Sequence, residues 1–188
     1  MSSSSPHNPC GPGERIEPFL DGRLQVIQSR SGYRFSVDAL LLADFVRVRK
    51  GDRVVDLGTG CGIIPLLLLC SRRIESVVGL EVQEELALQA IRNAGLNGFD
   101  NRFLLVRGGL RRPPLKHGGF HAVICNPPYR RARSGRINPD RERAVARHEI
   151  MASLDDILRA ARVLLRGKGR LSLIYPAERV TDLLARMR

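Results

Sequence analysis

The chain has 188 residues, a length typical of one domain, and its 43% hydrophobic residues can bury a sizeable core. Its 31 Lys and Arg against 19 Asp and Glu give a net charge of +12, which favours an acidic partner, most simply a nucleic acid. A genome rich in G and C also raises the arginine content, so the charge alone is weak evidence. The longest apolar run, 63–70, is far too short to span a membrane, and we expect neither a signal peptide nor a membrane partner.

The four cysteines, Cys10, Cys61, Cys70 and Cys125, form no C-x-x-C pair and no spacing typical of metal ligands. This usage is typical of reduced thiols, so we expect a cytoplasmic protein. We also expect no metal site.

The first 50 residues precede a regular alternation of strands and helices. Residues 1–15 are rich in Ser, Pro and Gly and are expected to form a disordered tail. Two short strands, 24–27 and 33–35, are predicted to pair as a hairpin around Ser31-Gly32. Ser36 is placed to cap a helix over 37–46. We expect 16–50 to pack on a core that begins at residue 51.

A glycine-rich loop follows the first core strand. The strand is predicted at 53–57, the loop is Gly58-Thr59-Gly60-Cys61-Gly62, and a helix follows at 63–70. A strand, such a loop and a helix N-terminus together form a cradle for a nucleotide, which the glycines allow to approach the backbone closely. The spacing is G-x-G-x-G, not the dinucleotide pattern G-x-G-x-x-G, so it does not indicate NAD.

An acidic residue ends the second core strand. That strand is predicted at 76–80, and Glu81 follows it, 19 residues after Gly62. An acid at this position can hold both ribose hydroxyls of a bound nucleotide. The alternative is that Glu81 only caps the next helix, predicted at 83–96. The apolar positions of that helix are Leu86, Ala90, Ile91 and Ala94.

A third strand, 102–107, and a basic loop lead to the apolar run 122–124, after which comes Asn126-Pro127-Pro128-Tyr129. Because proline has no N–H for a ladder, the pair ends the strand and leaves Asn126 at its carboxyl end, where open α/β sheets bind ligands. An exocyclic amine is a poor nucleophile, but the Asn126 oxygen and nearby carbonyls could hold its N–H groups so that the lone pair faces an electrophile. Tyr129 could stack on a planar base. An ordinary proline-rich turn explains the tetrapeptide alone equally well.

An arginine-rich stretch follows directly, with seven Arg between residues 130 and 147. We predict that it contacts substrate phosphates. The alternative is a solvated arginine-rich face. The residues predicted to bind substrate are Arg130, Arg131, Arg133, Arg136 and Arg147.

The remaining elements are a helix at 153–165, a fifth strand at 170–175 and a last helix from Pro176 to the end of the chain. Strands and helices alternate along the core. Right-handed crossovers then predict a doubly wound α/β fold with a mostly parallel sheet.

With these residues placed, the chain resembles class I S-adenosylmethionine-dependent methyltransferases. Segment 56–62 resembles their cofactor motif, and Asn126-Pro127-Pro128-Tyr129 resembles the catalytic motif of N6-adenine and glutamine methyltransferases. Segments 34–43, 138–140 with 147–149, and 174–179 are similar to the tRNA1(Val) adenine N6-methyltransferase family. That family modifies the adenosine just 3′ of the anticodon, so the resemblance implies tRNA or another RNA as partner.

The resemblance also implies S-adenosylmethionine as the cofactor. Asp56, Gly58 and Gly60 would line its methionine end, Glu81 would hold its ribose, and Ser36 and Asp38 would lie near it. The other residues expected in the cofactor site are Thr59, Gly62, Gly108 and Asn126.

The resemblance assigns catalysis to the segment 126–129. Asn126 would accept hydrogen bonds from the target amine, Pro127 and Pro128 would stiffen the loop, and Tyr129 would stack on the base. The reaction would be an in-line methyl transfer to N6. It needs no strong general base, because the proton can leave after the nitrogen has become cationic.

Two departures from the family pattern affect what we expect. The family usually has Gly-Asp after the third strand, but here the pair is Gly108-Gly109, and losing that acid would weaken cofactor binding by about 1.5–3 kcal/mol. We also count five core strands where the class has seven. The final strand hairpin is therefore expected to be absent, with 51–188 a C-terminally truncated core. The fifth strand would then be an open edge through which copies could self-associate.

Three other functions stay open at this point. A protein-glutamine methyltransferase fits the tetrapeptide equally well, although the arginine-rich stretch and the charge favour a polyanion. A DNA adenine methyltransferase is less favoured, because no separate target-recognition domain is visible. A non-catalytic RNA-binding remnant is motivated by Gly109 and the short C-terminus.

Overall fold

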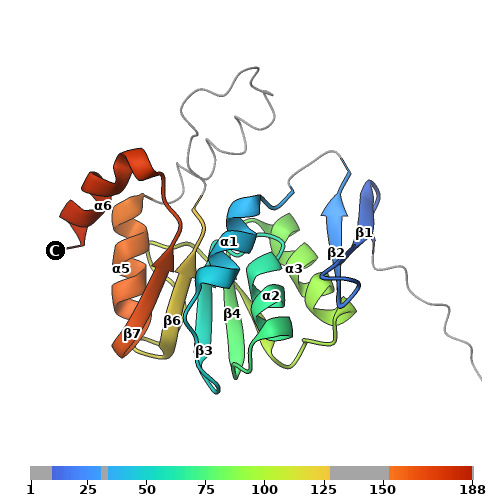
Figure 1. Ribbon diagram of the computed structural model, residues 1–188, viewed down its shortest axis with the longest axis horizontal. Helices are drawn as coiled ribbons and strands as arrows, with labels where there is room; N and C mark the ends of the chain where they lie inside the picture. Colours follow the sequence, from blue (N-terminus) through green and yellow to red (C-terminus); the bar gives the residue numbers. More distant parts are fainter. Residues whose placement is uncertain (1–9, 31–33, 128–152, 188) are drawn as a thin grey trace, which may run out of the picture.

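A computed structural model of the chain describes residues 10–30, 34–127 and 153–187. Five strands form a single parallel sheet in the order β5-β4-β3-β6-β7 (Figure 1). These strands are β3 (Arg53–Leu57), β4 (Ser76–Glu81), β5 (Phe103–Arg107), β6 (Phe120–Cys125) and β7 (Leu165–Leu173). The helices are α1 (Val37–Phe45), α2 (Ile63–Ser71), α3 (Glu84–Leu96), α5 (Leu154–Leu164), the 3₁₀ helix η1 (Ala177–Arg179) and α6 (Val180–Arg186). In the described part of the chain, no helix is long and apolar enough to cross a membrane.

The sheet separates two hydrophobic cores, because successive side chains of a strand point to opposite faces. On β3, Val54 belongs to the core beneath α1, α2 and α3, whereas Val55 belongs to the core beneath α5. Figure 1 shows these helices on opposite sides of the sheet. Helices on both faces of a parallel sheet form the doubly wound α/β arrangement that the sequence predicted.

The strand order reverses at β3. The chain passes from β3 through β4 to β5 in one direction, and β6 and β7 lie on the other side. Leu57, the last residue of β3, pairs with Leu80 of β4 and with Cys125 of β6. The loops after β3 and β6 therefore start side by side at the carboxyl edge of the sheet, the usual position of a ligand site in such folds.

The N-terminal hairpin differs from its prediction. β1 (Glu14–Phe19) pairs antiparallel with β2 (Leu24–Ser29), and neither strand joins the main sheet. Arg34 and Phe35 lie outside any strand, so the predicted pairing of 24–27 with 33–35 is wrong. The hairpin also begins inside the stretch predicted as a tail, because the Glu14 carboxylate accepts hydrogen bonds from Arg92 (2.8 Å) and Gln89 (3.2 Å) of α3.

The same contacts correct the predicted face of α3. Ile91 is one of the four apolar positions named for this helix, but it is 50% exposed. Gln89 and Asn93 are buried instead, because the hairpin covers this side of the helix and supplies partners for polar groups. An apolar-periodicity pattern cannot show a buried face whose partners are polar.

The C-terminal elements also end earlier than predicted. β7 stops at Leu173, which pairs with Cys125, the last residue of β6. One more backbone bond follows, from the Ile174 N–H to the Cys125 carbonyl (3.3 Å), and Pro127 then has no N–H with which to continue the ladder. The last helix is divided into η1 and α6. β7 lies at an edge of the sheet as predicted, and self-association through it stays a prediction.

Candidate cofactor and catalytic site

The glycine-rich loop leaves β3 at the carboxyl edge with backbone angles that suit glycine. Gly58, Gly60 and Gly62 have φ values of 71°, 57° and 85°, a region that other residues rarely adopt. Gly58 is exposed, and a Cβ added there would meet no atom within 4 Å. The Gly58 N–H donates to the carbonyl of Leu80 (2.8 Å), which ties the loop to the end of β4. Gly58 therefore presents open backbone to a ligand.

Gly62 has a different role, in packing. A Cβ at Gly62 would lie 2.6 Å from the Phe103 ring and 3.3 Å from the Ala90 Cβ. The third glycine thus lets α2 approach β5 and α3 closely. The contact of Gly62 with the cofactor stays a prediction. Packing against Phe103 and Ala90 is enough to explain why this position requires glycine.

Asp56 lies beneath the loop and is 1% exposed. Its Oδ2 accepts a hydrogen bond from the Thr59 hydroxyl (2.7 Å), so this predicted cofactor residue orients Asp56. The Asp56 Oδ1 is buried without a hydrogen-bond partner in the described structure. Burial, opposed by the Thr59 bond and reinforced by the charge of Glu81, raises the pKa of Asp56 to about 7. A buried acceptor without a partner is suited to a donor supplied by a ligand.

Glu81 lies at the predicted strand tip but is 1% exposed. Its Oε2 accepts from the Gly60 N–H (2.9 Å), and its Oε1 accepts from the N–H groups of Val82 (3.0 Å) and Gln83 (2.9 Å). Glu81 therefore fixes both the glycine-rich loop and the entry to α3, for which Gln83 is the N-cap. A carboxylate accepts about four hydrogen bonds, so one position remains for a ribose hydroxyl. The ribose contact stays a prediction.

The other predicted cofactor residues lie at the start of α1 and the end of β5. Figure 1 shows α1 beginning at the edge where β6 ends, and the Ser36 hydroxyl lies 3.4 Å from a carboxylate oxygen of Asp38. The Gly108 N–H donates to the Glu81 carbonyl (3.0 Å), and a Cβ there would lie 2.8 Å from Pro114. The space around Gly109 is open, with no atom within 4 Å of an added Cβ.

Asn126 follows the last residue of β6, as predicted, and is partly exposed. Cys125, the last residue of β6, pairs with Leu57, the last residue of β3. Asn126 and Gly58, the next residue of each strand, therefore start the two neighbouring loops at the same level of the sheet. Pro127 is also described. The remaining predicted residues lie outside the described residues, and their roles stay predictions. They are Pro128, Tyr129, Arg130, Arg131, Arg133, Arg136 and Arg147.

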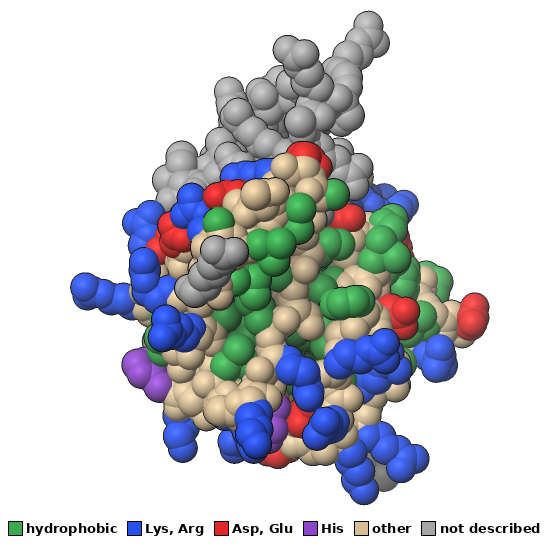
Figure 2. Space-filling model, turned by 60° about the vertical axis from the view of Figure 1, so that its left-hand side comes forward, with side chains coloured by type: hydrophobic (Ala, Val, Ile, Leu, Met, Phe, Trp, Pro, Cys, Tyr) green, Lys and Arg blue, Asp and Glu red, His purple; other side chains and the backbone are tan. Residues whose placement is uncertain are grey.

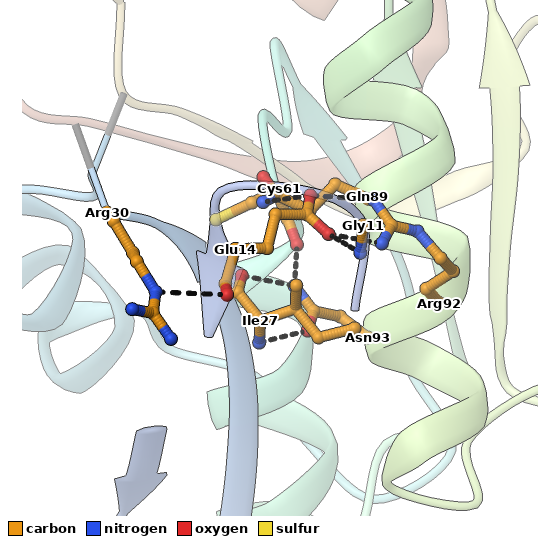
Figure 3. A network of polar contacts seen from close by, with 8 residues as sticks. All are labelled: Gly11, Glu14, Ile27, Arg30, Cys61, Gln89, Arg92 and Asn93. Carbon is orange, nitrogen blue, oxygen red and sulfur yellow. Dashed lines mark hydrogen bonds and ion pairs between the residues drawn. The ribbon is translucent and has the colours of Figure 1, made fainter. Parts of the chain in front are cut away.

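The sequence interpretation missed Asn93, which supports the loop from behind (Figure 3). Asn93 is completely buried on α3. Its Nδ2 donates to the Cys61 carbonyl in the loop (2.9 Å), and its Oδ1 accepts from the Ile27 N–H on β2 (2.7 Å). One side chain thus joins the hairpin, α3 and the glycine-rich loop. The only sequence signal was an Asn between two apolar positions of the helix.

The two buried cysteines near this edge do not supply reactive thiolates. Burial raises the pKa of Cys61 to about 11 and raises that of Cys125 well above its usual value. The described residues contain no cluster of three or more His, Cys, Asp or Glu side chains that could hold a metal ion.

These residues fit a cationic nucleoside cofactor. The unpartnered Asp56 oxygen can accept from an ammonium group, and the open backbone at Gly58 allows close approach. S-Adenosylmethionine carries an ammonium group on its methionine end and two ribose hydroxyls. The arrangement therefore matches that cofactor in the positions that the structure describes.

Comparison with known proteins agrees with this geometry. A family model described as "Methyltransferase small domain" matches residues 31–180. A tRNA1(Val) (adenine(37)-N6)-methyltransferase of Porphyromonas gingivalis is 30% identical over 173 residues, which are 88% of this chain and 67% of that protein. A protein of the same name from Tolumonas auensis is 29% identical over 169 residues, or 89% of this chain and 69% of that protein.

Solved structures share the fold. A crystal structure described as a "predicted O-methyltransferase" of Agrobacterium tumefaciens is similar with a TM-score of 0.62 and 26% identity, over 79% of this chain and 65% of that one. A geranyl diphosphate methyltransferase in complex with S-adenosylmethionine has a TM-score of 0.57 and 19% identity, over 79% of this chain and 56% of that one. The chain spans less than two thirds of these solved proteins. Since the family model covers most of the chain, the chain belongs to the methyltransferase small domain family.

Proposed function

We propose that this chain transfers a methyl group from S-adenosylmethionine to the exocyclic N6 of an adenine in RNA, at a tRNA adenosine next to the anticodon. The observation that carries the proposal is the position of Asn126, one residue beyond the β3–β6 pairing that also positions the glycine-rich loop. The names of the relatives from Porphyromonas gingivalis and Tolumonas auensis supply the target base and the class of RNA. The net charge of +12 suits a polyanionic substrate.

In this proposal the methyl donor supplies an electrophilic methyl group on a sulfonium. Asp56 accepts from the ammonium group of the methionine end, and Glu81 accepts from one ribose hydroxyl. The Asn126 side-chain oxygen accepts from the N6 amine, so that the nitrogen lone pair faces the methyl group. Holding the amine in this orientation lowers the entropic part of the activation barrier, and this is the main contribution to catalysis expected from the protein.

The test is methyl transfer from labelled S-adenosylmethionine into unmodified tRNA, read by nucleoside mass spectrometry. We expect N6-methyladenosine in the product. Asn126→Ala should lower the rate at least about 100-fold, in the range for loss of one preorganised contact. Its cofactor affinity, measured by calorimetry, should be unchanged. Gln25→Ala, which removes an exposed amide of the N-terminal hairpin, is the matched control and should keep full activity.

Each other result has a defined meaning. Turnover retained in Asn126→Ala would refute the role of this residue. Methylation of a protein glutamine and not of RNA would show that the substrate is a protein, and would refute the proposed RNA substrate. No transfer together with no cofactor binding would identify the chain as an RNA-binding remnant of the fold.

A further inference from the structure

The edge of the sheet opposite the proposed site is strongly basic. It is formed by the amino-terminal ends of the five strands and the segments that lead into them, and we call it the amino edge. The amino edge comprises residues 47–53, 71–76, 99–103, 116–121 and 165–170. Its cationic side chains are Arg47, Arg49, Lys50, Arg53, Arg72, Arg73, Arg102, Lys116, Arg166, Lys168 and Arg170. Figure 2 shows Lys and Arg gathered along the lower rim, where these segments lie.

Few carboxylates balance these cations. Only Asp52, Glu75 and Asp100 belong to the same segments, against eleven Lys and Arg. Asp52 is 6% exposed, and its carboxylate accepts from the Arg49 backbone N–H (2.7 Å) and from Arg170 (3.4 Å). The amino edge therefore holds most of the net charge of the chain in one region.

Several of the cations have no ionic partner. Arg47, Arg49, Arg53 and Arg73 are exposed, and their guanidinium groups form no ion pair with any carboxylate that the structure describes. Like charges gathered in this way repel one another, and a polyanion relieves the repulsion while its counterions are released. Exposed arginines without partners are thus available for phosphates.

The amino edge also contains a groove of about 410 Å³. Arg72, Arg73 and Arg102 line it together with Ser71. The Arg102 guanidinium group donates to the carbonyls of Ile74 (2.8 Å) and Glu75 (3.4 Å), which holds that group in place at the groove. Guanidinium groups and a hydroxyl around a concave surface are the donors that phosphodiester groups bind.

We propose that the amino edge is a second RNA-binding surface, which holds the phosphate backbone of the substrate RNA away from the target nucleotide. The identity of that RNA rests on the proposed function. The amino edge lies one strand length from the site, about 17–20 Å for strands of five to six residues. An RNA bound at both edges passes along a face of the protein, and the distal contacts add affinity without reading the sequence.

The test compares two variants that remove the same charge. Arg49→Gln with Arg73→Gln neutralises the amino edge, and Arg15→Gln with Arg30→Gln neutralises two exposed arginines of the N-terminal hairpin. Binding of unmodified tRNA is measured by fluorescence anisotropy from 50 to 200 mM salt, without cofactor. Each lost phosphate contact should weaken binding about 5–8-fold at 0.1 M salt and lower the salt slope by about 0.7–0.9. Urea unfolding and cofactor affinity should match those of the unsubstituted chain in both variants.

A larger loss of slope in the amino-edge variant than in the hairpin variant would support the proposal. Equal slopes in the two variants would overturn it, because the charge would then act only as a diffuse field. Displacement of the RNA by polyglutamate at equal charge concentration would also overturn it, in favour of an acidic protein partner. If the two variants have equal salt slopes but the chain methylates tRNA, the amino-edge proposal fails and the proposed function stands. If the salt slopes differ but no methyl transfer is found, only the proposed function is refuted.

Discussion

Binding of S-adenosylmethionine should strengthen about five- to sixfold between pH 6.0 and pH 7.5, because Asp56 must lose a proton to carry the negative charge that pairs with the cofactor's ammonium group. The Asp56 carboxyl is 1% exposed, and burial is the main cause that raises its pKa to about 7. The charge of Glu81 acts in the same direction, and the Thr59 hydrogen bond acts against it.

The magnitude follows from that pKa. At pH 6.0 roughly one molecule in eleven carries the Asp56 carboxylate, and at pH 7.5 roughly three in four do, which gives about eightfold in apparent affinity. Below pH 6.5 each cofactor bound should release nearly one proton. The cofactor's own α-amino group titrates at about 7.7–8.0, and its partial loss of charge at pH 7.5 reduces the net gain to about five- to sixfold, so measurements stop there.

Calorimetry in two buffers of different ionisation enthalpy measures both the affinity and the proton release. Asp56→Asn is the control, since an amide cannot titrate. It should bind more weakly at pH 7.5 and show only the pH dependence of the cofactor's own amine. An affinity of the unsubstituted chain that stays constant across this range, with no proton release, would refute the assignment of Asp56 to the ammonium group.

The same pKa predicts how stability without cofactor varies with pH. Because the folded protein holds the Asp56 proton more tightly than the unfolded chain, this group stabilises the fold fully below about pH 4. That contribution is lost as the pH rises toward about 7. Urea unfolding at several pH values should show the decline in the unsubstituted chain and a weaker decline in Asp56→Asn. A decline of equal size in both would assign it to other groups.

Three further predictions concern the loop and its supports. Gly62→Ala should lower the free energy of unfolding by about 2–5 kcal/mol, because the new Cβ would meet the Phe103 ring and the alanine would have to keep a strained φ of 85°. Gly118→Ala, at a φ of 61° in open space, is the control and should cost only about 1–2 kcal/mol. Equal losses in urea unfolding would contradict the packing role of Gly62. Asn93→Leu should cost about 2–4 kcal/mol, because it leaves two buried backbone groups without partners, and unchanged stability would show that these bonds are replaced. Gly109→Asp should bind the cofactor about 10–100-fold more tightly in calorimetry, and an equal gain in Gly109→Asn would exclude a charge effect.

Local chemistry determined much of the carboxyl edge. The β3 strand, the glycine-rich loop and α2 could be predicted because positive φ angles at Gly58 and Gly62 suit only glycine. The end of β6 before Asn126 could be predicted because proline cannot continue a ladder. The doubly wound arrangement followed from the handedness of crossovers, which depends on chain chirality, whereas the strand order came from the tertiary structure.

Only the tertiary structure decided what depends on residues far apart in the chain. β2 pairs with β1, which the Glu14–Arg92 contact holds against α3. The turn pattern at Ser31 had predicted a different partner for β2. The role of Asn93 arises from Ile27 and Cys61, which lie 66 and 32 residues away. The protonation of Asp56 likewise depends on burial beneath the loop. Burial and long-range hydrogen bonds exist only after the chain has collapsed. Local patterns could therefore locate Asp56 at the end of a strand, but could not show its protonation, the role of Asn93 or the partner of β2.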